Sequence, residues 1–268
     1  MRPALDRLLP GPDPVLLDGA MGTALRQRGW PVSEPTVLAN LDAPELVAAV
    51  HRSYREVGAA VLHTNTFGAL LGTAFSDERR LDAVRAGLRL AREAAAGAAL
   101  VAGSLGAYDL VFQGPRLTEV VRALVEAGVD LLVFETCNQA HDAQIALEVH
   151  AEIAPGLPAV ICASSTDGSH ADVKRVAEVA ALVAASDRDV ELGLNCCRGP
   201  HEAYKLALGL PAFPRWLKPS TGPPEDRVDD NVMAAFARAA VQRGARFLGG
   251  CCGSDADTLR LMASALHL

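Results

Sequence analysis

The stretch Leu131-Leu132-Val133-Phe134-Glu135-Thr136 is the best guide to the fold of this chain. A nearly continuous apolar run is typical of a parallel strand that is buried on both of its faces. Here the run ends in a carboxylate, which is costly to bury without a partner. The pattern therefore predicts a buried strand with a functional acidic residue, Glu135, at its carboxyl end.

Similar apolar runs recur along the chain and alternate with longer amphipathic segments. The predicted strands cover residues 15–20, 60–67, 100–106, 131–136, 159–164, 191–196, 215–220 and 246–251. The predicted helices cover 45–57, 78–95, 117–127, 141–152, 173–184, 202–208, 231–242 and 256–266. Eight strand–helix units in 268 residues match the length of an eight-stranded barrel. We expect an α/β fold, a (β/α)8 TIM barrel, in which residues 1–268 form a single domain.

Composition excludes several functional classes. The chain has 25 basic and 32 acidic residues, a net charge of −7 and no basic run, so nucleic-acid binding is not expected. No apolar stretch approaches the roughly 20 residues that cross a bilayer. Residues 1–6 lack the apolar core of a secretory signal, and the six cysteines do not resemble a disulfide framework. We expect a cytoplasmic protein with no membrane partner.

Polar residues gather where the predicted strands end, which is where barrels of this kind place their chemistry. These residues are Asp18, Thr64, Asn65, Ser104, Glu135, Ser164, Cys196, Cys251 and Cys252. The clustering at one rim indicates an enzyme.

Two cysteine pairs dominate this set. They lie in Gly193-Leu194-Asn195-Cys196-Cys197 and Gly249-Gly250-Cys251-Cys252-Gly253. Neighbouring cysteines do not easily bond to each other, because a disulfide needs Cα atoms about 5.5 Å apart. Thiolates between glycines suit a soft metal, and three of them without a fourth ligand describe an open zinc site. Cys196 and Cys197 compete for the third position.

Six ordered motifs carry a family resemblance. They are Asp18-Gly19-Ala20-Met21-Gly22-Thr23, Thr64-Asn65-Thr66-Phe67, Gly103-Ser104-Leu105-Gly106, Glu135-Thr136, Gly193-Leu194-Asn195-Cys196 and Gly249-Gly250-Cys251-Cys252-Gly253. Together they resemble the zinc-dependent homocysteine S-methyltransferase family, which includes betaine– and S-methylmethionine–homocysteine methyltransferases and the homocysteine module of cobalamin-dependent methionine synthase. The resemblance spans nearly the whole chain.

The resemblance implies roles for individual residues. Cys196, Cys251 and Cys252 match the three zinc ligands. Asp18 and Glu135 match acidic groups near the amino end of the bound amino acid, and Gly19 matches a backbone contact. Thr64, Asn65 and Ser104 are predicted to bind substrate, with the bracing of loops as the alternative.

The expected reaction moves a methyl group from a small-molecule donor to the zinc-activated thiolate of homocysteine, giving methionine. The donor is left open among S-methylmethionine, S-adenosylmethionine and betaine-like or sulfonium compounds. One alternative is a homocysteine-activating module that needs methyl-cobalamin or another methyl-carrying partner protein. Another is a zinc- or thiol-binding protein without turnover. A further alternative is a structural zinc site in a barrel with other chemistry, such as hydrolysis.

The remaining polar and thiol groups receive simpler interpretations. Cys137 and Cys162 are expected to be buried as small apolar side chains. His63, His141 and His201 are expected to be structural or solvated. Lys218 lies in Lys218-Pro219-Ser220-Thr221-Gly222, where several relatives carry a Pro-Asn-Ala-Gly-like turn, and is expected to be a solvated lysine at the rim.

Overall fold

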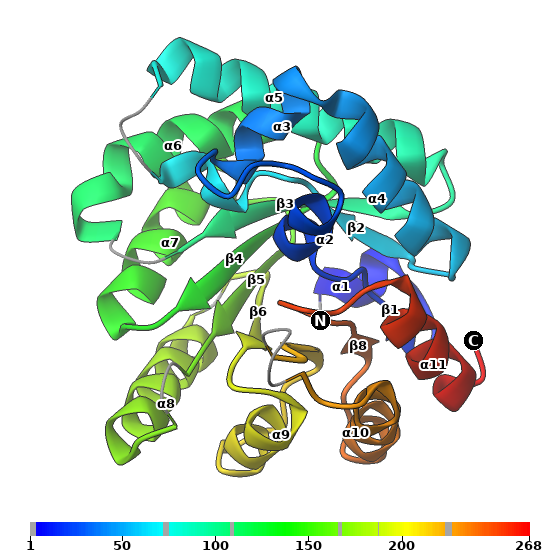
Figure 1. Ribbon diagram of the computed structural model, residues 1–268. Helices are drawn as coiled ribbons and strands as arrows, with labels where there is room; N and C mark the ends of the chain where they lie inside the picture. The colour runs from blue at the N-terminus through cyan, green and yellow to red at the C-terminus, as the bar shows by residue number, and fades with distance from the viewer. Residues whose placement is uncertain (1–3, 72–74, 108–109, 166–167, 187, 223–226) are drawn as a thin grey trace.

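A computed structural model describes residues 4–71, 75–107, 110–165, 168–186, 188–222 and 227–268. Eight parallel strands follow one another in the order β1-β8-β7-β6-β5-β4-β3-β2 (Figure 1). A parallel bridge between Leu17 and Val61 joins the two ends of this sheet into a ring. The strands are Val15–Leu16 (β1), Val61–His63 (β2), Leu100–Gly106 (β3), Leu131–Cys137 (β4), Ala159–Ala163 (β5), Val190–Cys196 (β6), Trp216–Pro219 (β7) and Phe247–Leu248 (β8). The predicted (β/α)8 TIM barrel is confirmed.

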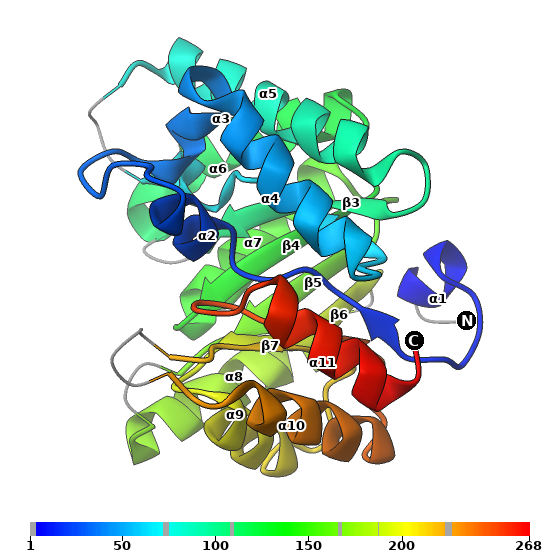
Figure 2. The ribbon, with the colours of Figure 1, turned by 45° about the vertical axis from the view of Figure 1, so that its right-hand side comes forward.

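Helices cover the outside of the ring (Figures 1 and 2). They are α3 (Ala39–Asp42), α4 (Pro44–Glu56), α5 (Asp77–Ala95), α6 (Leu110–Glu126), α7 (Ala140–Ile153), α8 (His170–Ala185), α9 (Pro200–Leu208), α10 (Asp230–Gln242) and α11 (Ala256–Leu266). Side chains before the first turn fix several helix starts: Ser76 caps α5, Ser169 caps α8 and Asp255 forms a capping box at α11.

Two short helices lie at opposite ends of the barrel (Figure 2). The first, α1 (Ala4–Leu8), places the buried Leu5 against the side chains that fill the ring. Asp6 of α1 forms ion pairs with Arg215 and Arg246, which precede β7 and β8. The second, α2 (Met21–Gln27), follows β1 at the other end. Because α1 covers the amino ends of the strands, the carboxyl ends are left as the accessible face.

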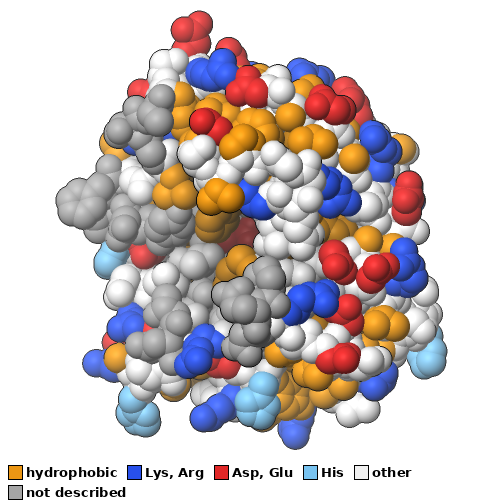
Figure 3. All heavy atoms as spheres, viewed as in Figure 1, with side chains coloured by type: hydrophobic (Ala, Val, Ile, Leu, Met, Phe, Trp, Pro, Cys, Tyr) orange, Lys and Arg blue, Asp and Glu red, His pale blue; other side chains and the backbone are white. Residues whose placement is uncertain are grey.

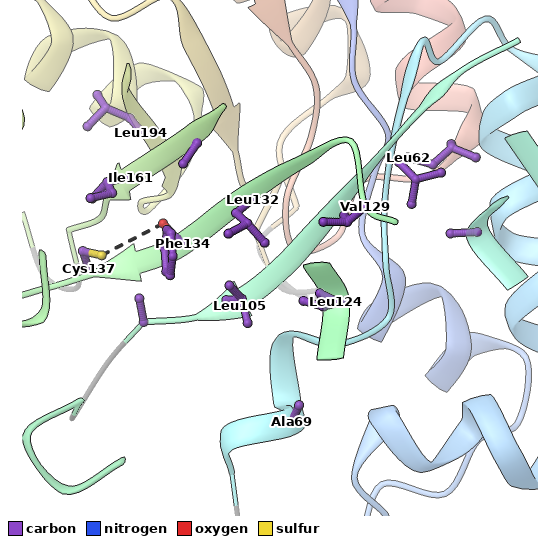
Figure 4. Close-up of a cluster of buried hydrophobic side chains, with 14 of the residues drawn as sticks. Leu62, Ala69, Leu105, Leu124, Val129, Leu132, Phe134, Cys137, Ile161 and Leu194 are labelled. Atoms are coloured by element: carbon purple, nitrogen blue, oxygen red, sulfur yellow. Dashed lines mark hydrogen bonds between the residues drawn. The ribbon is translucent and has the colours of Figure 1, made fainter. Parts of the chain in front are cut away.

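Strand alternation separates the core into two layers. Leu131 and Val133 of β4 point into the ring, where they pack with residues such as Trp216. Leu132 and Phe134 point outward and pack under the helices (Figure 4). Cys137 and Cys162 are buried in the outer and inner layers respectively, as predicted. The inner layer fills the ring, so ligands are confined to its mouth.

Several boundaries differ from those predicted. β1 and β8 end at Leu16 and Leu248, although strands were expected over 15–20 and 246–251. The chain turns irregularly there but keeps backbone hydrogen bonds, including Gly250 N to Asp18 O and Cys251 N to Pro219 O. The strand expected over 60–67 stops at His63, and 3-10 helices form at Thr36–Leu38 and Phe67–Leu70. In the part of the chain that the structure describes, no helix has the length and apolar character to cross a membrane.

Gly193 makes room for the largest side chain of the inner layer. A Cβ atom at this position would lie 2.7 Å from Cys162 Sγ and 3.0 Å from Trp216 Cδ1. Both neighbours are fully buried, so a Cβ atom at Gly193 would force packed side chains of the inner layer to shift.

We therefore predict that Gly193→Ala overpacks the ring and lowers the free energy of unfolding by about 1–3 kcal/mol. Urea unfolding followed by circular dichroism measures the change. Gly156→Ala is the matched control, because a Cβ atom at Gly156 has no neighbour within 4 Å among the described residues. Equal stability of the two variants would contradict the packing argument.

Candidate active site

A cavity of about 240 Å³ lies at the carboxyl ends of the strands. Its walls come from most of the ring, and it is bordered by the start of α2. The lining residues include Gly19, Met21, His63, Thr64, Asn65, Phe67, Ser104, Glu135, Cys196, Lys218, Cys251 and Cys252. A hollow is visible near the centre of the face on which α2 lies (Figure 3). All three predicted metal-binding cysteines therefore share one cavity with Glu135.

The three sulfur atoms form a compact cluster. Cys196, Cys251 and Cys252 place their Sγ atoms within 4.8 Å of one another. Cys196 Sγ lies 2.8 Å from Cys251 Sγ and 3.9 Å from Cys252 Sγ. Zinc–sulfur bonds of about 2.3 Å at tetrahedral angles place sulfurs ~3.8 Å apart. The Cys196–Cys252 separation matches this spacing, whereas Cys196 and Cys251 lie closer together than two sulfurs on one zinc ion. Three thiols so close together could hold a soft metal ion, and Cys252 is exposed.

Backbone conformation explains how these sulfurs meet. Cys196 has φ 54° and Cys197 has φ 53°, so the chain makes a left-handed turn where β6 ends. Gly253 has φ 82°, and a Cβ atom there would lie 2.3 Å from Thr221 Oγ1. The second cysteine pair can therefore approach the first because a glycine follows it.

The turn also distinguishes Cys196 from Cys197. The Cys197 side chain is buried, and its Sγ contacts the carbonyl of Asn195 at 3.4 Å. The cluster that could hold a metal contains Cys196 and not Cys197, among the residues that can be described. The geometry favours Cys196 as the third ligand.

Glu135 is a buried carboxyl group held on both sides. Ser104 Oγ donates a hydrogen bond to its Oε1, and Asn195 Nδ2 donates to its Oε2 over 3.3 Å. Burial raises the pKa of Glu135 above its ordinary value, and His63 and Lys218 offset part of this effect. A positively charged ligand group bound to this carboxylate would compensate for the hydration that burial removes.

Asp18 is surrounded by donors. Its Oδ1 lies 2.6 Å from Lys218 Nζ and 2.7 Å from His63 Nδ1, and its Oδ2 accepts from the His63 backbone N at 2.7 Å. Burial would raise the pKa of Asp18, but His63 and Lys218 outweigh it and hold the pKa well below its ordinary range. Asp18 is thus an ionised group beneath the cavity, and its oxygens are already engaged.

Lys218 corrects the prediction of a solvated rim lysine. Its side chain is 4% exposed and pairs with Asp18. Burial alone would lower the pKa of Lys218, but the carboxylates of Asp18 and Glu135 hold it above its ordinary value. Lys218 is therefore a buried cation that lines the cavity.

Thr64, Asn65, Ser104 and Gly19 all line the cavity. Asn65 Nδ2 donates to Asn40 Oδ1 and to Thr36 O, so its amide also braces a neighbouring loop. Thr64 Oγ1 accepts a hydrogen bond from Ser104 N at 3.1 Å. A Cβ atom at Gly19 would lie 2.9 Å from the Tyr54 ring, so only glycine fits there without movement. Their roles toward a substrate stay predictions.

His63, Asn195 and Lys218 were missed as site residues, although the sequence holds a signal for them. Each lies two positions after a residue that faces the inside of the ring: Val61, Gly193 and Trp216. Strand alternation therefore aims them into the mouth of the barrel. The His63 ring contacts the Trp216 ring edge-on, with centroids 5.6 Å apart.

The sequence and the structure are both similar to known methyltransferases. The profile of the family described as homocysteine S-methyltransferase matches residues 15–266. A homocysteine S-methyltransferase from Escherichia coli (strain K12) is 29% identical over 97% of this chain and 97% of its own length. A selenocysteine methyltransferase from Astragalus bisulcatus is 26% identical over 91% of this chain and 90% of its own length.

Two further matches extend this comparison. A methionine synthase from Mycobacterium tuberculosis is 26% identical over 93% of this chain, which corresponds to 24% of that protein. The crystal structure of the metallated form of the homocysteine methyltransferase MmuM from Escherichia coli has a TM-score of 0.80 at 25% identity. That match covers 97% of this chain and 99% of the other.

We predict that the charges of Asp18 and Lys218 are strongly coupled. Asp18→Asn or Lys218→Met each leaves a buried charge without its partner, so each lowers the free energy of unfolding by about 3–5 kcal/mol. The double variant Asp18→Asn/Lys218→Met removes both charges and costs less than the sum of the two. Urea unfolding of samples with matched metal content measures the cycle. Additive costs would contradict the coupling.

Glu135 yields a prediction of pH dependence. A carboxyl group with a raised pKa binds its proton more tightly in the folded protein, so its contribution to stability falls as pH rises past its ordinary value. Relative to the native protein, Glu135→Gln should therefore gain stability as pH increases above about 4, while the difference between the two stays constant at lower pH. Thermal or urea unfolding across pH tests this, with the exposed Glu119→Gln as control. A constant difference at every pH would refute it.

Proposed function

The chain belongs to the homocysteine S-methyltransferase family, and from this premise we propose that it transfers a methyl group from a small-molecule donor to homocysteine, giving methionine. We further propose that Cys196, Cys251 and Cys252 hold zinc for this reaction. The meeting of the three sulfurs with a buried acidic group in one cavity is the observation that carries the proposal. Thiolates from two separate turns leave one position for a ligand sulfur in a tetrahedral site.

Zinc, when bound, supplies the acidity that makes the acceptor thiol a thiolate at neutral pH. The chain's own residues position that sulfur. Glu135 accepts the ammonium group of homocysteine, with Ser104 and Asn195 fixing the carboxylate in place. Holding the acceptor at both ends orients its sulfur for in-line attack.

The methyl transfer forms one carbon–sulfur bond and breaks the bond between the methyl group and its donor. The acceptor thiol releases its proton to solvent, and its sulfur forms a bond to the methyl carbon as the bond between that carbon and the donor breaks. The electron pair of the broken bond stays with the donor, so a sulfonium donor leaves as a neutral thioether. Donors that carry a positive charge on the leaving atom are favoured, because S-methylmethionine, S-adenosylmethionine and betaine all become neutral at that atom.

A methyl-carrying partner protein is the second candidate donor. The observation that favours it is the match to 24% of a methionine synthase, because this chain corresponds to one part of that longer protein. A donor screen distinguishes the two. Zinc-loaded protein, homocysteine and each small-molecule donor with a deuterated methyl group are incubated, and labelled methionine is measured by mass spectrometry. Methionine formed only with a methylated partner protein would replace the small-molecule proposal.

We predict that Cys251→Ala, Cys252→Ala and Cys196→Ala each lose zinc and methyl transfer, while the far-UV circular dichroism spectrum is retained. Loss of one of three protein ligands removes the site that holds the metal and positions the sulfur. Zinc content by mass spectrometry and methionine formation are measured together.

Two variants serve as controls for the thiol chemistry. Cys197→Ala removes the neighbouring thiol that lies outside the cluster, and Cys137→Ala removes a buried thiol in the outer layer. Both are expected to keep zinc and activity. If Cys197→Ala lost zinc and Cys196→Ala kept it, Cys197 would be the third ligand in place of Cys196. Full activity in a zinc-free variant would overturn the mechanism.

A further inference from the structure

We propose that Lys218 binds the α-carboxylate of the acceptor, so that Lys218 and Glu135 together recognise an amino-acid zwitterion. This inference rests on the proposed function, because it takes the acceptor to be homocysteine or a similar amino acid. It gives Asp18 an indirect role as the group that holds Lys218, rather than as a direct partner of the ammonium group.

The charges that line the cavity support this assignment. Among the described residues of the lining, Glu135 is the only carboxylate and Lys218 the only lysine or arginine. An α-amino acid carries one positive and one negative group on the same carbon. One anion and one cation at the floor of the cavity match these two groups in sign and number.

Register places the two groups on either side of one residue. Asn195 of β6 is the Cα partner of Lys218 on β7. The side chain of Asn195 donates to Glu135 Oε2 over 3.3 Å. Lys218 and Glu135 are therefore both neighbours of Asn195 at the mouth of the ring.

Lys218 also retains hydrogen-bonding capacity. Its ammonium group has three donors, and Asp18 Oδ1 takes one of them. His63 Nδ1 lies 3.2 Å from Nζ but is itself 2.7 Å from Asp18 Oδ1, so the ring N–H donates to Asp18 rather than accepting from Lys218. Nζ can thus offer its other donors to a carboxylate in the cavity while Asp18 fixes its position.

Asp18 is less available to an ammonium group than Glu135, because it already accepts three hydrogen bonds and does not line the cavity. Both of its oxygens accept hydrogen bonds from Lys218 and His63, and it is 1% exposed. Glu135 has no such cation bonded to it, and its bonds come from the neutral side chains of Ser104 and Asn195. The ammonium group is therefore assigned to Glu135 and the carboxylate to Lys218.

Equilibrium binding without a methyl donor tests the proposal. Isothermal titration calorimetry compares L-homocysteine with 3-aminopropane-1-thiol, which lacks the carboxylate, on zinc-loaded protein. Lys218→Met should weaken homocysteine binding by about 10- to 100-fold and leave the aminothiol nearly unchanged, because one charged hydrogen-bonding partner is lost. Both ligands carry the same thiol, so its contribution cancels in the ratio of their dissociation constants.

A mirror experiment uses Glu135→Gln. This variant should weaken homocysteine and 3-aminopropane-1-thiol, but not 4-sulfanylbutanoate, which keeps the carboxylate and lacks the ammonium group. The double variant Asp18→Asn/Lys218→Met guards against misfolding, since it buries neither charge. It should show the same loss of carboxylate discrimination as Lys218→Met.

Equal weakening of homocysteine and the aminothiol in both Lys218 variants would overturn the carboxylate assignment. The two proposals fail separately. Carboxylate-dependent binding with no methionine from any donor contradicts the proposed function and upholds the role of Lys218. If the native protein forms methionine and Lys218→Met binds homocysteine with unchanged affinity, the proposed function is upheld and the role of Lys218 is contradicted.

Discussion

The alternation of side chains along strands in a closed ring is the constraint on which the site depends. Positions that point inward form an apolar layer that includes Val61, Val133 and Trp216. The inward position two residues later on each of these strands is polar: His63, Glu135 and Lys218. The polar layer therefore lies directly on a filled, water-excluding core, which makes its charges both costly and effective.

Such a layer must balance its own charges. Lys218 is paired with Asp18 at 2.6 Å, and His63 completes the shell around that carboxylate. Glu135 is bonded to neutral groups, so its charge is the less compensated of the two acids. Breaking the Asp18–Lys218 pair would leave an unpaired buried charge, whereas a cationic ligand at Glu135 would neutralise one. We therefore assign a stabilising role to Asp18, which lies beneath the cavity, and propose a binding role for Glu135, which lines it.

The sequence predicted the barrel and the cysteine cluster more fully than the charged layer. The strand over 100–106 was predicted at its observed bounds, because a long apolar run defines both ends. The thiols were recognised because glycines surround them. Lys218 was expected to be solvated and His63 to be structural or solvated. Their direction follows from alternation with Trp216 and Val61, and the strand register establishes that those two residues face inward. The irregular ends of β1 and β8 depend on tertiary hydrogen bonds, such as Gly250 N to Asp18 O, which no local pattern encodes.

The two halves of the site have different structural origins. Cys196 ends β6 and Cys252 lies in a turn. The left-handed backbone at Cys196 and the glycine after Cys252 allow the sulfurs to meet. Glu135 and Lys218 lie on strands, and their directions follow from register with the apolar layer beneath them. A change in a turn would therefore alter the sulfur cluster without moving the charged groups. In our proposal, the amino-acid end of the acceptor is recognised by residues of the ring, and the loops above the ring control access of the methyl donor.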